Sequence, residues 1–294
     1  MADWKGAGKS VALFFDRCGW ELLSDGAVAA DLFCHLSYSF GLHDENETQL
    51  ETSLHQQLKD LYSTASSVQE DWVGDYRIDV RRGRRLIEIQ TSSLGAIRDK
   101  IRALLERHPV TVVKPIVARK MLLIKDRPLG PVTARRWSPK RCNWLDLFDA
   151  LTHFTTVFPH PNLTLDVPLI EIEETRFPRK ARRFWHRAYR IEDQRLLQVV
   201  DHRTVRTAED LVQLLAVTLP AAFDTKDLAD ALSTRRWMAQ KVAYCLRQTG
   251  GIAIEGKRGN AWLYRVANQV VRSKPIRKPS TPKSRKEKGG HQAA

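Results

Sequence analysis

The sequence lacks closely spaced cysteines. Its four cysteines, Cys18, Cys34, Cys142 and Cys245, are far apart, and they form neither a CxxC motif nor a Cys/His cluster. This spacing excludes a zinc ribbon and a disulfide framework. We therefore expect the thiols to be reduced residues of a hydrophobic core.

The chain also lacks a long apolar segment. No run approaches the roughly 20 residues that a membrane-spanning helix requires. The opening residues MADWKGAGKS lead into a short apolar stretch that Asp16 and Arg17 interrupt, whereas a signal peptide has a longer apolar region and a small-residue cleavage site. These features predict a cytoplasmic protein that makes no membrane contact.

Acidic residues are too few to balance the basic ones. The formal net charge is +14 and the isoelectric point is about 9.8. The positive excess gathers at residues 77–85, 176–190, 235–241 and after 272. Because lysine and arginine neutralise phosphates, this clustering favours a face that binds a polyanion. DNA is the expected partner; RNA is a weaker alternative, since no RNA-recognition motif is present.

The chain divides into segments of different pattern. The predicted fold class is α/β, with a mixed central β-sheet flanked by helices. The segments are residues 1–46, of unassigned role; 47–126, the α/β core; 127–202, a connector or extension of the core with a basic patch; 203–270, a helical module; and 271–294, a basic tail. The tail is too polar to bury a core, so we expect it to be disordered.

Within the core, periodicity indicates helices and strands in alternation. Leucines at three- and four-residue spacing predict a helix over 47–62, followed by a polar bridge over 63–71. Alternation around Gly83 predicts a β-hairpin over 72–90. A helix over 92–108 and two buried strands, 110–118 and 121–126, complete this part.

The remaining segments are less regular. Proline and glycine predict a loop over 127–145, followed by a helix and a strand at 163–174. The basic run at 176–190 is either a grip on a nucleic-acid backbone, with its aromatic residues stacking on bases, or an amphipathic helix. Helices at 207–217, 225–232 and 234–248 with a hairpin at 251–266 have the outline of a winged helix-turn-helix. Such a module binds DNA or, alternatively, mediates protein contacts.

Three acids carry the main chemical prediction. Asp79 and Glu88 lie on either side of the turn at Gly83, so the hairpin places them on neighbouring strands. Gln90 shares parity with Glu88, while Ile87 and Ile89 point into the core. Glu51 lies on the preceding helix and reaches the same sheet edge if that helix packs there. Carboxylate oxygens in this arrangement suit Mg²⁺ or Mn²⁺.

A simpler interpretation stays open for each acid taken alone. Asp79 then only solvates and caps a basic hairpin, and Glu88 only pairs with one of its arginines.

The ordered set resembles the PD-(D/E)XK, or restriction-endonuclease-like, nuclease superfamily. The matching stretches are ETSLHQQLK with Glu51, DYRIDV with Asp79, and LIEIQT with Glu88 and Gln90. The resemblance implies that Asp79 and Glu88 hold Mg²⁺ or Mn²⁺, that the Ile89 carbonyl adds a ligand, and that Glu51 binds a second metal or a water. It also implies an endonuclease or exonuclease that hydrolyses DNA phosphodiester bonds in repair, recombination or defence.

One position departs from the family pattern. Gln90 stands where the family most often has lysine, and an amide cannot supply a positive charge. Lys100 on the next helix or Lys114 on the next strand are candidates to restore it, and His55 shares a helical face with Glu51. The alternative is a non-catalytic DNA-binding or regulatory protein that retains the nuclease fold. A homodimer is left open.

Basic side chains at three places are the candidate nucleic-acid contacts. They are Arg81, Arg82, Arg84 and Arg85 on the hairpin; Arg179, Lys180, Arg182 and Arg183 in the basic run; and Arg235, Arg236, Lys241, Lys257 and Arg258 in the helical module.

Overall fold

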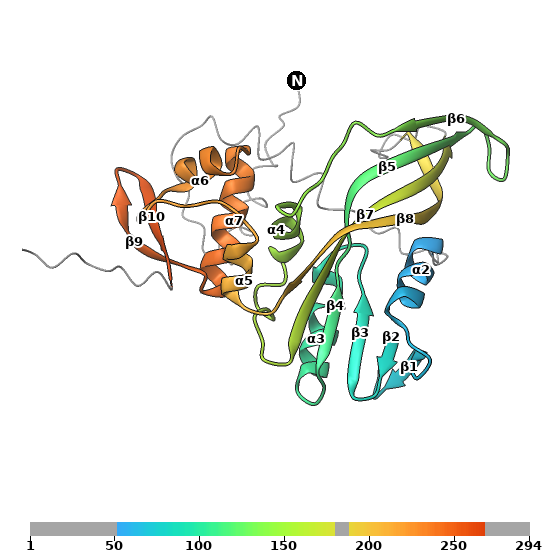
Figure 1. Cartoon of the computed structure of the whole chain (residues 1–294), viewed down its shortest axis with the longest axis horizontal. Coiled ribbons are helices and arrows are strands. Elements are labelled where there is room, and N and C mark those ends of the chain that lie inside the picture. Colours follow the sequence, from blue (N-terminus) through green and yellow to red (C-terminus); the bar gives the residue numbers. More distant parts are fainter. Residues whose placement is uncertain (1–51, 180–187, 268–294) are drawn as a thin grey trace, which may run out of the picture. The chain divides into compact units, whose positions relative to one another are not determined.

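A computed structural model describes residues 52–179 and 188–267 of the chain, which belong to one compact unit. Its centre is a mixed eight-stranded sheet with helices on both faces, which confirms the predicted α/β class (Figure 1). A separate two-stranded sheet lies near the C-terminal end of this part. In chain order the elements are α2 (Ser53–Tyr62), β1 (Val68–Val73), β2 (Tyr76–Arg82), β3 (Arg85–Ile89), the 3-10 turn η2 (Leu94–Ile97), α3 (Arg98–Leu105), β4 (Val110–Val113), β5 (Ile116–Lys125), β6 (Val132–Trp137), α4 (Asp146–Leu151), β7 (Leu163–Pro178), β8 (Tyr189–Val205), α5 (Ala208–Gln213), α6 (Thr225–Ala231), α7 (Arg236–Thr249), β9 (Ile252–Arg258) and β10 (Ala261–Val266).

The sheet is organised around the long strand β7. Strands β4 and β5 both run parallel to β7 on the same edge, with Val113 opposite Asp166 and Ile116 opposite Leu169. They behave as one strand interrupted at Pro115, because proline has no N–H to donate to a ladder. Strand β3 pairs in parallel with β4, and β6 pairs antiparallel with β5. The sheet therefore branches at the break between β4 and β5.

Helices α2 and α3 cover opposite faces of the β1–β4 part. Leu54 and Leu58 of α2 pack with Val80 and Ile87, in a cluster separate from the main core. The apolar side of α3, including Ile101, packs in the main core. Apolar spacing of three and four residues in each helix accounts for the two buried stripes. The turn between β2 and β3 uses Gly83, whose φ of 58° favours glycine.

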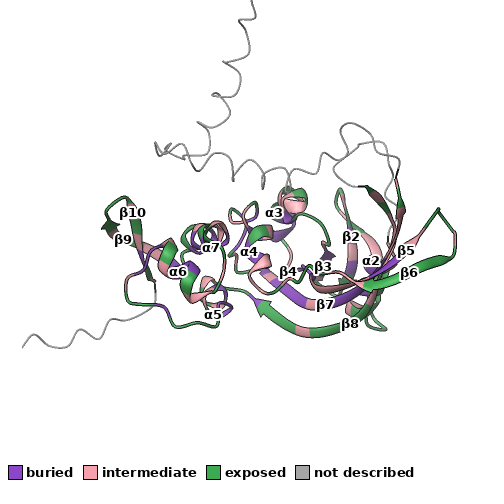
Figure 2. Ribbon diagram, turned by 90° about the horizontal axis from the view of Figure 1, so that it is seen from above, coloured by how far each residue is buried: buried purple, intermediate pink, exposed green. Residues whose placement is uncertain are grey.

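Three strands lie where the sequence predicts other structure. Strand β1 occupies the end of the expected polar bridge, and β6 lies inside the expected loop at 127–145. Strand β8 spans 17 residues along β7, partly within the basic run at 176–190, whose residues 180–187 lie outside the described part. Strands β6 and β8 are mostly exposed while β7 is mostly buried (Figure 2). Strand β1 has no fully buried residue, so none of the three missed strands carries a clear hydrophobic period.

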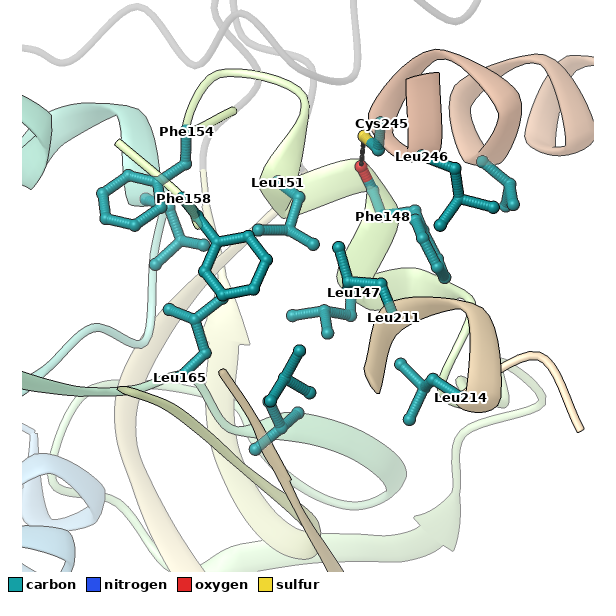
Figure 3. Packing of buried hydrophobic residues seen from close by; sticks show 14 of the residues in the cluster. Leu147, Phe148, Leu151, Phe154, Phe158, Leu165, Leu211, Leu214, Cys245 and Leu246 are labelled. Carbon is teal, nitrogen blue, oxygen red and sulfur yellow. Dashed lines mark hydrogen bonds between the residues drawn. The ribbon is translucent and has the colours of Figure 1, made fainter. Parts of the chain in front are cut away.

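Three helices and a hairpin follow the sheet, as predicted. They share the main hydrophobic core with α3 and α4, where Leu147, Phe148 and Leu246 are fully buried (Figure 3). The Cys245 thiol donates to the Phe148 carbonyl oxygen at 3.3 Å, which joins α7 to α4. Residue Phe223, before α6, bridges to Tyr264 of β10. The predicted core role of Cys245 is thus confirmed.

Among the described residues, no helix is both long and apolar enough to cross a membrane. The predictions made for residues 1–46, for the tail at 271–294 and for Lys180, Arg182 and Arg183 lie outside the described part of the chain.

Candidate active site

Strands β2 and β3 separate at Asp79. Their backbone pairing runs from Arg82 opposite Arg85 to Val80 opposite Ile87. Beyond that pair, the Ile89 amide donates to the Asp79 carboxylate, Oδ2, at 2.7 Å. The Asp79 side chain thus accepts the hydrogen bond that a backbone carbonyl of β2 would otherwise accept, and the two strands separate at this end of the hairpin.

Lys100 of α3 occupies this opening from the other side. Its ammonium donates to Glu88 Oε1 at 2.6 Å and to the Arg77 carbonyl oxygen at 2.5 Å. Lys100 therefore connects both strands at the point where they diverge. Of the two lysines suggested as a source of positive charge, Lys100 is the one that contacts a predicted site carboxylate.

Glu88 is buried with one carboxylate oxygen unsatisfied. Only 7% of the residue is exposed. Oε2 has no hydrogen-bond partner among the residues that the structure describes. Burial, together with the nearby Asp79 charge, raises the pKa of Glu88 to about 7, although Lys100 acts to lower it. Lys100 pairs with the other oxygen, Oε1, but a buried polar atom without a partner is costly, so Oε2 is the unfavourable feature of this side chain.

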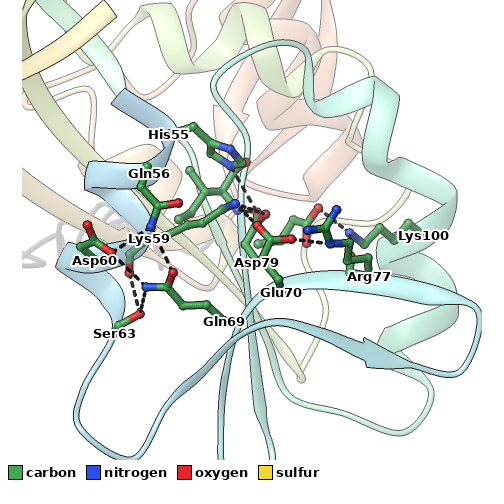
Figure 4. A network of polar contacts seen from close by, with 12 residues as sticks. His55, Gln56, Lys59, Asp60, Ser63, Gln69, Glu70, Arg77, Asp79 and Lys100 are labelled. Atoms are coloured by element: carbon green, nitrogen blue, oxygen red, sulfur yellow. Dashed lines mark hydrogen bonds and ion pairs between the residues drawn. The ribbon is translucent and has the colours of Figure 1, made fainter. Parts of the chain in front are cut away.

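Asp79 has the opposite balance of forces, and Figure 4 shows its contacts with side chains of α2. Burial acts to raise its pKa, but hydrogen bonds from His55 and the Ile89 amide, together with the Lys59 charge, hold that pKa below its usual value. His55 Nε2 lies 3.4 Å from Asp79 Oδ2 and 3.2 Å from the Ile89 carbonyl oxygen. Lys59 Nζ lies 3.8 Å from Asp79 Oδ1. The predicted helical His55 therefore does reach the site.

Glu70 is a site residue that the sequence reasoning missed. On β1 it lies between Gln69, which pairs with Val80, and Asp71, which pairs with Ile78, so Glu70 is opposite Asp79. Its carboxylate contacts Lys59 and lies 2.5 Å from Arg77 Nε. Its φ of 56° is unusual for a residue with a side chain. No sequence signal marked it, because residues 63–71 show only polar composition.

The Gln90 side chain binds the loop that follows it, not the site carboxylates. Its amide donates to the Ser93 carbonyl oxygen at 2.9 Å, and Ser92 Oγ donates to Gln90 Oε1 at 3.2 Å. Lys114 holds the same loop by donating to the carbonyl oxygens of Thr91 and Ser92 at 3.0 and 2.5 Å. Burial lowers the pKa of Lys114 to about 8. Both side chains brace the loop after β3.

Glu51, the predicted third acid, lies outside the described residues. Within 52–179 and 188–267, no three His, Cys, Asp or Glu side chains gather closely enough to hold a metal ion by themselves. Asp79 and the Ile89 carbonyl, which meet side chains of α2, and Glu88, which meets Lys100 of α3, nevertheless offer hard oxygen ligands at the point where β2 and β3 separate. Mg²⁺ commonly binds through one or two carboxylates and retains several waters.

The basic hairpin is only partly available for a ligand. Arg81 pairs with Asp71 at 2.7 Å, and Arg85 donates to Thr111 Oγ1 at 3.1 Å. Arg82 and Arg84 are exposed. Of the four contacts predicted in the basic run, Arg179 is the one within the described residues, and its backbone amide donates to the Ala188 carbonyl oxygen.

The predicted basic contacts of the helical module also differ from one another. Arg235 and Arg236 are exposed at the start of α7. Lys241 instead pairs with Asp149 of α4, and Arg258 pairs with Asp227 at 3.0 Å. Lys257 Nζ lies 4.3 Å from the centre of the Trp262 ring.

A family description named "Domain of unknown function (DUF8091)" matches residues 52–206, which is more than half of the 294 residues. The chain belongs to this family. The matched residues run from the start of α2 to the end of β8. The family is therefore defined by the sheet and the site elements, and α5–α7 with the hairpin lie beyond it.

A relative from Treponema pallidum (strain Nichols), described as "Uncharacterized protein", is 31% identical over 216 residues. The match spans 73% of this chain and 85% of the relative. No solved structure matches this chain.

The raised pKa of Glu88 predicts that Glu88→Gln stabilises the metal-free protein in alkaline solution. The folded carboxyl ionises near pH 7 and the unfolded one near 4.5, so ionisation destabilises the fold progressively between these values. At pH 8 in EDTA we expect the variant to melt about 5 °C above wild type, with little difference at pH 4.5. Melting followed by circular dichroism measures this.

Glu174→Gln is the matched control. Glu174 is also buried and pairs with Lys120 at 2.6 Å, as Glu88 does with Lys100, but Gln194 also donates to Glu174 at 2.9 Å and none of its oxygens is buried without a partner. Its loss should therefore lower the melting temperature at pH 8. A Glu88→Gln variant less stable than wild type at pH 8 would show that the ionised Glu88 carboxylate does not destabilise the fold.

Proposed function

We propose that this protein is a metal-dependent nuclease that hydrolyses DNA phosphodiester bonds. One observation carries the proposal: where β2 and β3 separate, Glu88 Oε2 is buried without a hydrogen-bond partner among the described residues, and Asp79 is near enough for its charge to act on Glu88. Two adjacent carboxylates without a shared cation repel each other. A divalent cation relieves both the repulsion and the unsatisfied oxygen.

The residues present suit Mg²⁺ or Mn²⁺. Asp79, Glu88 and the Ile89 carbonyl would hold the ion, and all three offer oxygen, which these cations prefer. A bound divalent cation lowers the pKa of an attacking water and neutralises charge on the scissile phosphate.

The order of elements supports the resemblance to the PD-(D/E)XK superfamily. Helix α2 precedes the antiparallel strands β1–β3, and α3 connects β3 to the parallel strand β4. The acids lie on the second and third of these strands. Assignment to that superfamily is part of this proposal, as is the role of Glu51.

The surrounding side chains have separate roles in the proposed reaction. Lys100 supplies the positive charge that Gln90 cannot, and its ammonium is placed to donate to a phosphate oxygen beside Glu88. His55 and Lys59 are positioning residues that hold the Asp79 carboxylate ionised. Gln90 and Lys114 are positioning residues for the loop at 91–93.

Substrate contact is proposed for the exposed basic residues outside the carboxylate site. Arg82 and Arg84 extend from the hairpin, and Arg235 and Arg236 lie at the start of α7. The three helices and hairpin have the order of a winged helix-turn-helix, with α7 as the groove-reading helix. Lys241 faces α4, whereas Arg235 and Arg236 at the start of α7 are exposed and are the proposed contacts.

A non-catalytic DNA-binding protein is the second candidate. The observation that favours it is the full set of partners around Asp79, which His55, Lys59 and the Ile89 amide satisfy without a cation. In that case the protein shifts the mobility of DNA but does not cut it.

Cleavage assays separate the two candidates. Plasmid and single-stranded DNA are incubated with Mg²⁺, Mn²⁺ or EDTA. Asp79→Asn and Glu88→Gln are each expected to lower the cleavage rate by at least about 100-fold, because both remove charge from the cation site. Asp126→Asn, at an exposed carboxylate after β5, is the control and should cleave as wild type does. Cleavage that persists in EDTA or in both site variants rejects the proposal.

The two lysines provide a second test. Lys100→Met is expected to slow cleavage about 100-fold, with Lys100→Arg restoring part of the rate, because its role is positive charge beside Glu88. Lys114→Met should instead loosen the loop at 91–93, which limited proteolysis or hydrogen exchange detects. Equal activity of wild type and Lys100→Met, at equal stability, excludes the role given to Lys100.

A further inference from the structure

A pocket of about 320 Å³ lies at the turn end of the β2–β3 hairpin. It lies between the ends of strand β1, the β2–β3 turn and the turn after α3. Its lining includes Trp72, Arg81, Arg84, Leu86, Arg107 and His108. This volume is at the lower end of the roughly 300–1,000 Å³ typical of pockets for small ligands.

The charge of the pocket is only partly compensated. Arg81 pairs with Asp71. Arg84 and Arg107 are exposed, and neither has a carboxylate partner within residues 52–179 and 188–267. Two uncompensated guanidinium groups at one pocket favour an anion with several oxygens, such as a phosphate.

The pocket also presents an exposed aromatic ring. Trp72 is 65% exposed and lies on β1, the edge strand of the sheet. An exposed tryptophan beside arginines has the composition of surfaces that bind unpaired nucleotides, where the ring stacks on a base and the cations contact the backbone.

The pocket lies close to the carboxylates. Leu86, one of its lining residues, and Glu88 are two residues apart on β3, so they project to the same face about 7 Å apart. A strand whose phosphate reaches Glu88 can therefore place a neighbouring nucleotide over Trp72.

We propose that this pocket binds one unpaired nucleotide of a single-stranded nucleic acid, next to the bond that is cut. The proposal rests on the proposed nuclease function and specifies its substrate. Single-stranded substrate is favoured because a base in a duplex already stacks on its neighbours, and its face reaches Trp72 only after unpairing.

Equilibrium binding in EDTA tests this without any cleavage. A fluorescein-labelled oligonucleotide and its duplex are titrated with full-length protein, and fluorescence anisotropy gives Kd. Trp72→Ala should weaken single-strand binding on the order of tenfold and duplex binding less than about twofold. Trp72→Phe should restore most of the affinity, since it keeps a ring that stacks. Circular dichroism checks that each variant folds.

The arginines are tested in the same assay. Arg84→Gln combined with Arg107→Gln should also weaken single-strand binding about tenfold. Arg136→Gln combined with Arg141→Gln is the control, because it removes the same charge from exposed residues outside the pocket.

Equal losses for single strand and duplex, or no loss in Trp72→Ala, overturn the proposal. Failure of the nuclease function is a separate result. If wild type does not cleave with Mg²⁺ but Trp72→Ala still loses single-strand affinity selectively, the pocket binds the nucleotide in a protein that does not cut.

Discussion

The candidate site depends on one unfavourable interaction, the repulsion between the Asp79 and Glu88 carboxylates. The Ile89 amide fixes Asp79 at 2.7 Å, and Lys100 fixes Glu88 at 2.6 Å. The surroundings shift the two acids in opposite directions: the pKa of Asp79 is lowered and the pKa of Glu88 is raised. Divergent pKa values in adjacent acids are typical of functional sites, although structural ion pairs also produce them.

The surrounding fold can be understood as support for this contact. Helix α2 brings His55 and Lys59 to one face, and α3 brings Lys100 to the other. Each helix is held by its own hydrophobic cluster, so the two sides are positioned independently. The family match covers all of these elements, and the three C-terminal helices add a surface whose Arg235 and Arg236 remain exposed.

Much of the core could be predicted from local pattern, and much of the site could not. Leucine spacing located α2, and alternation around Gly83 placed Asp79 and Glu88 on adjacent strands, because these signals act over a few residues. Strand β8 was missed because an exposed edge strand needs little apolar periodicity. The contacts of Glu70 and Lys100 depend on how separate elements pack. Parity predicted that Gln90 faces as Glu88 does, but the strand ends at Ile89 and the amide turns to its own loop.

The most direct measurement is a crystal structure of the protein grown with Mn²⁺, with the anomalous signal used to locate the ion. The account predicts an anomalous peak roughly 2.0–2.6 Å from oxygens of Asp79, Glu88 and the Ile89 carbonyl. The account would be contradicted by Mn²⁺ bound at full occupancy elsewhere and no anomalous peak at Asp79 and Glu88. In that result His55 would still contact Asp79 and Lys100 would still contact Glu88.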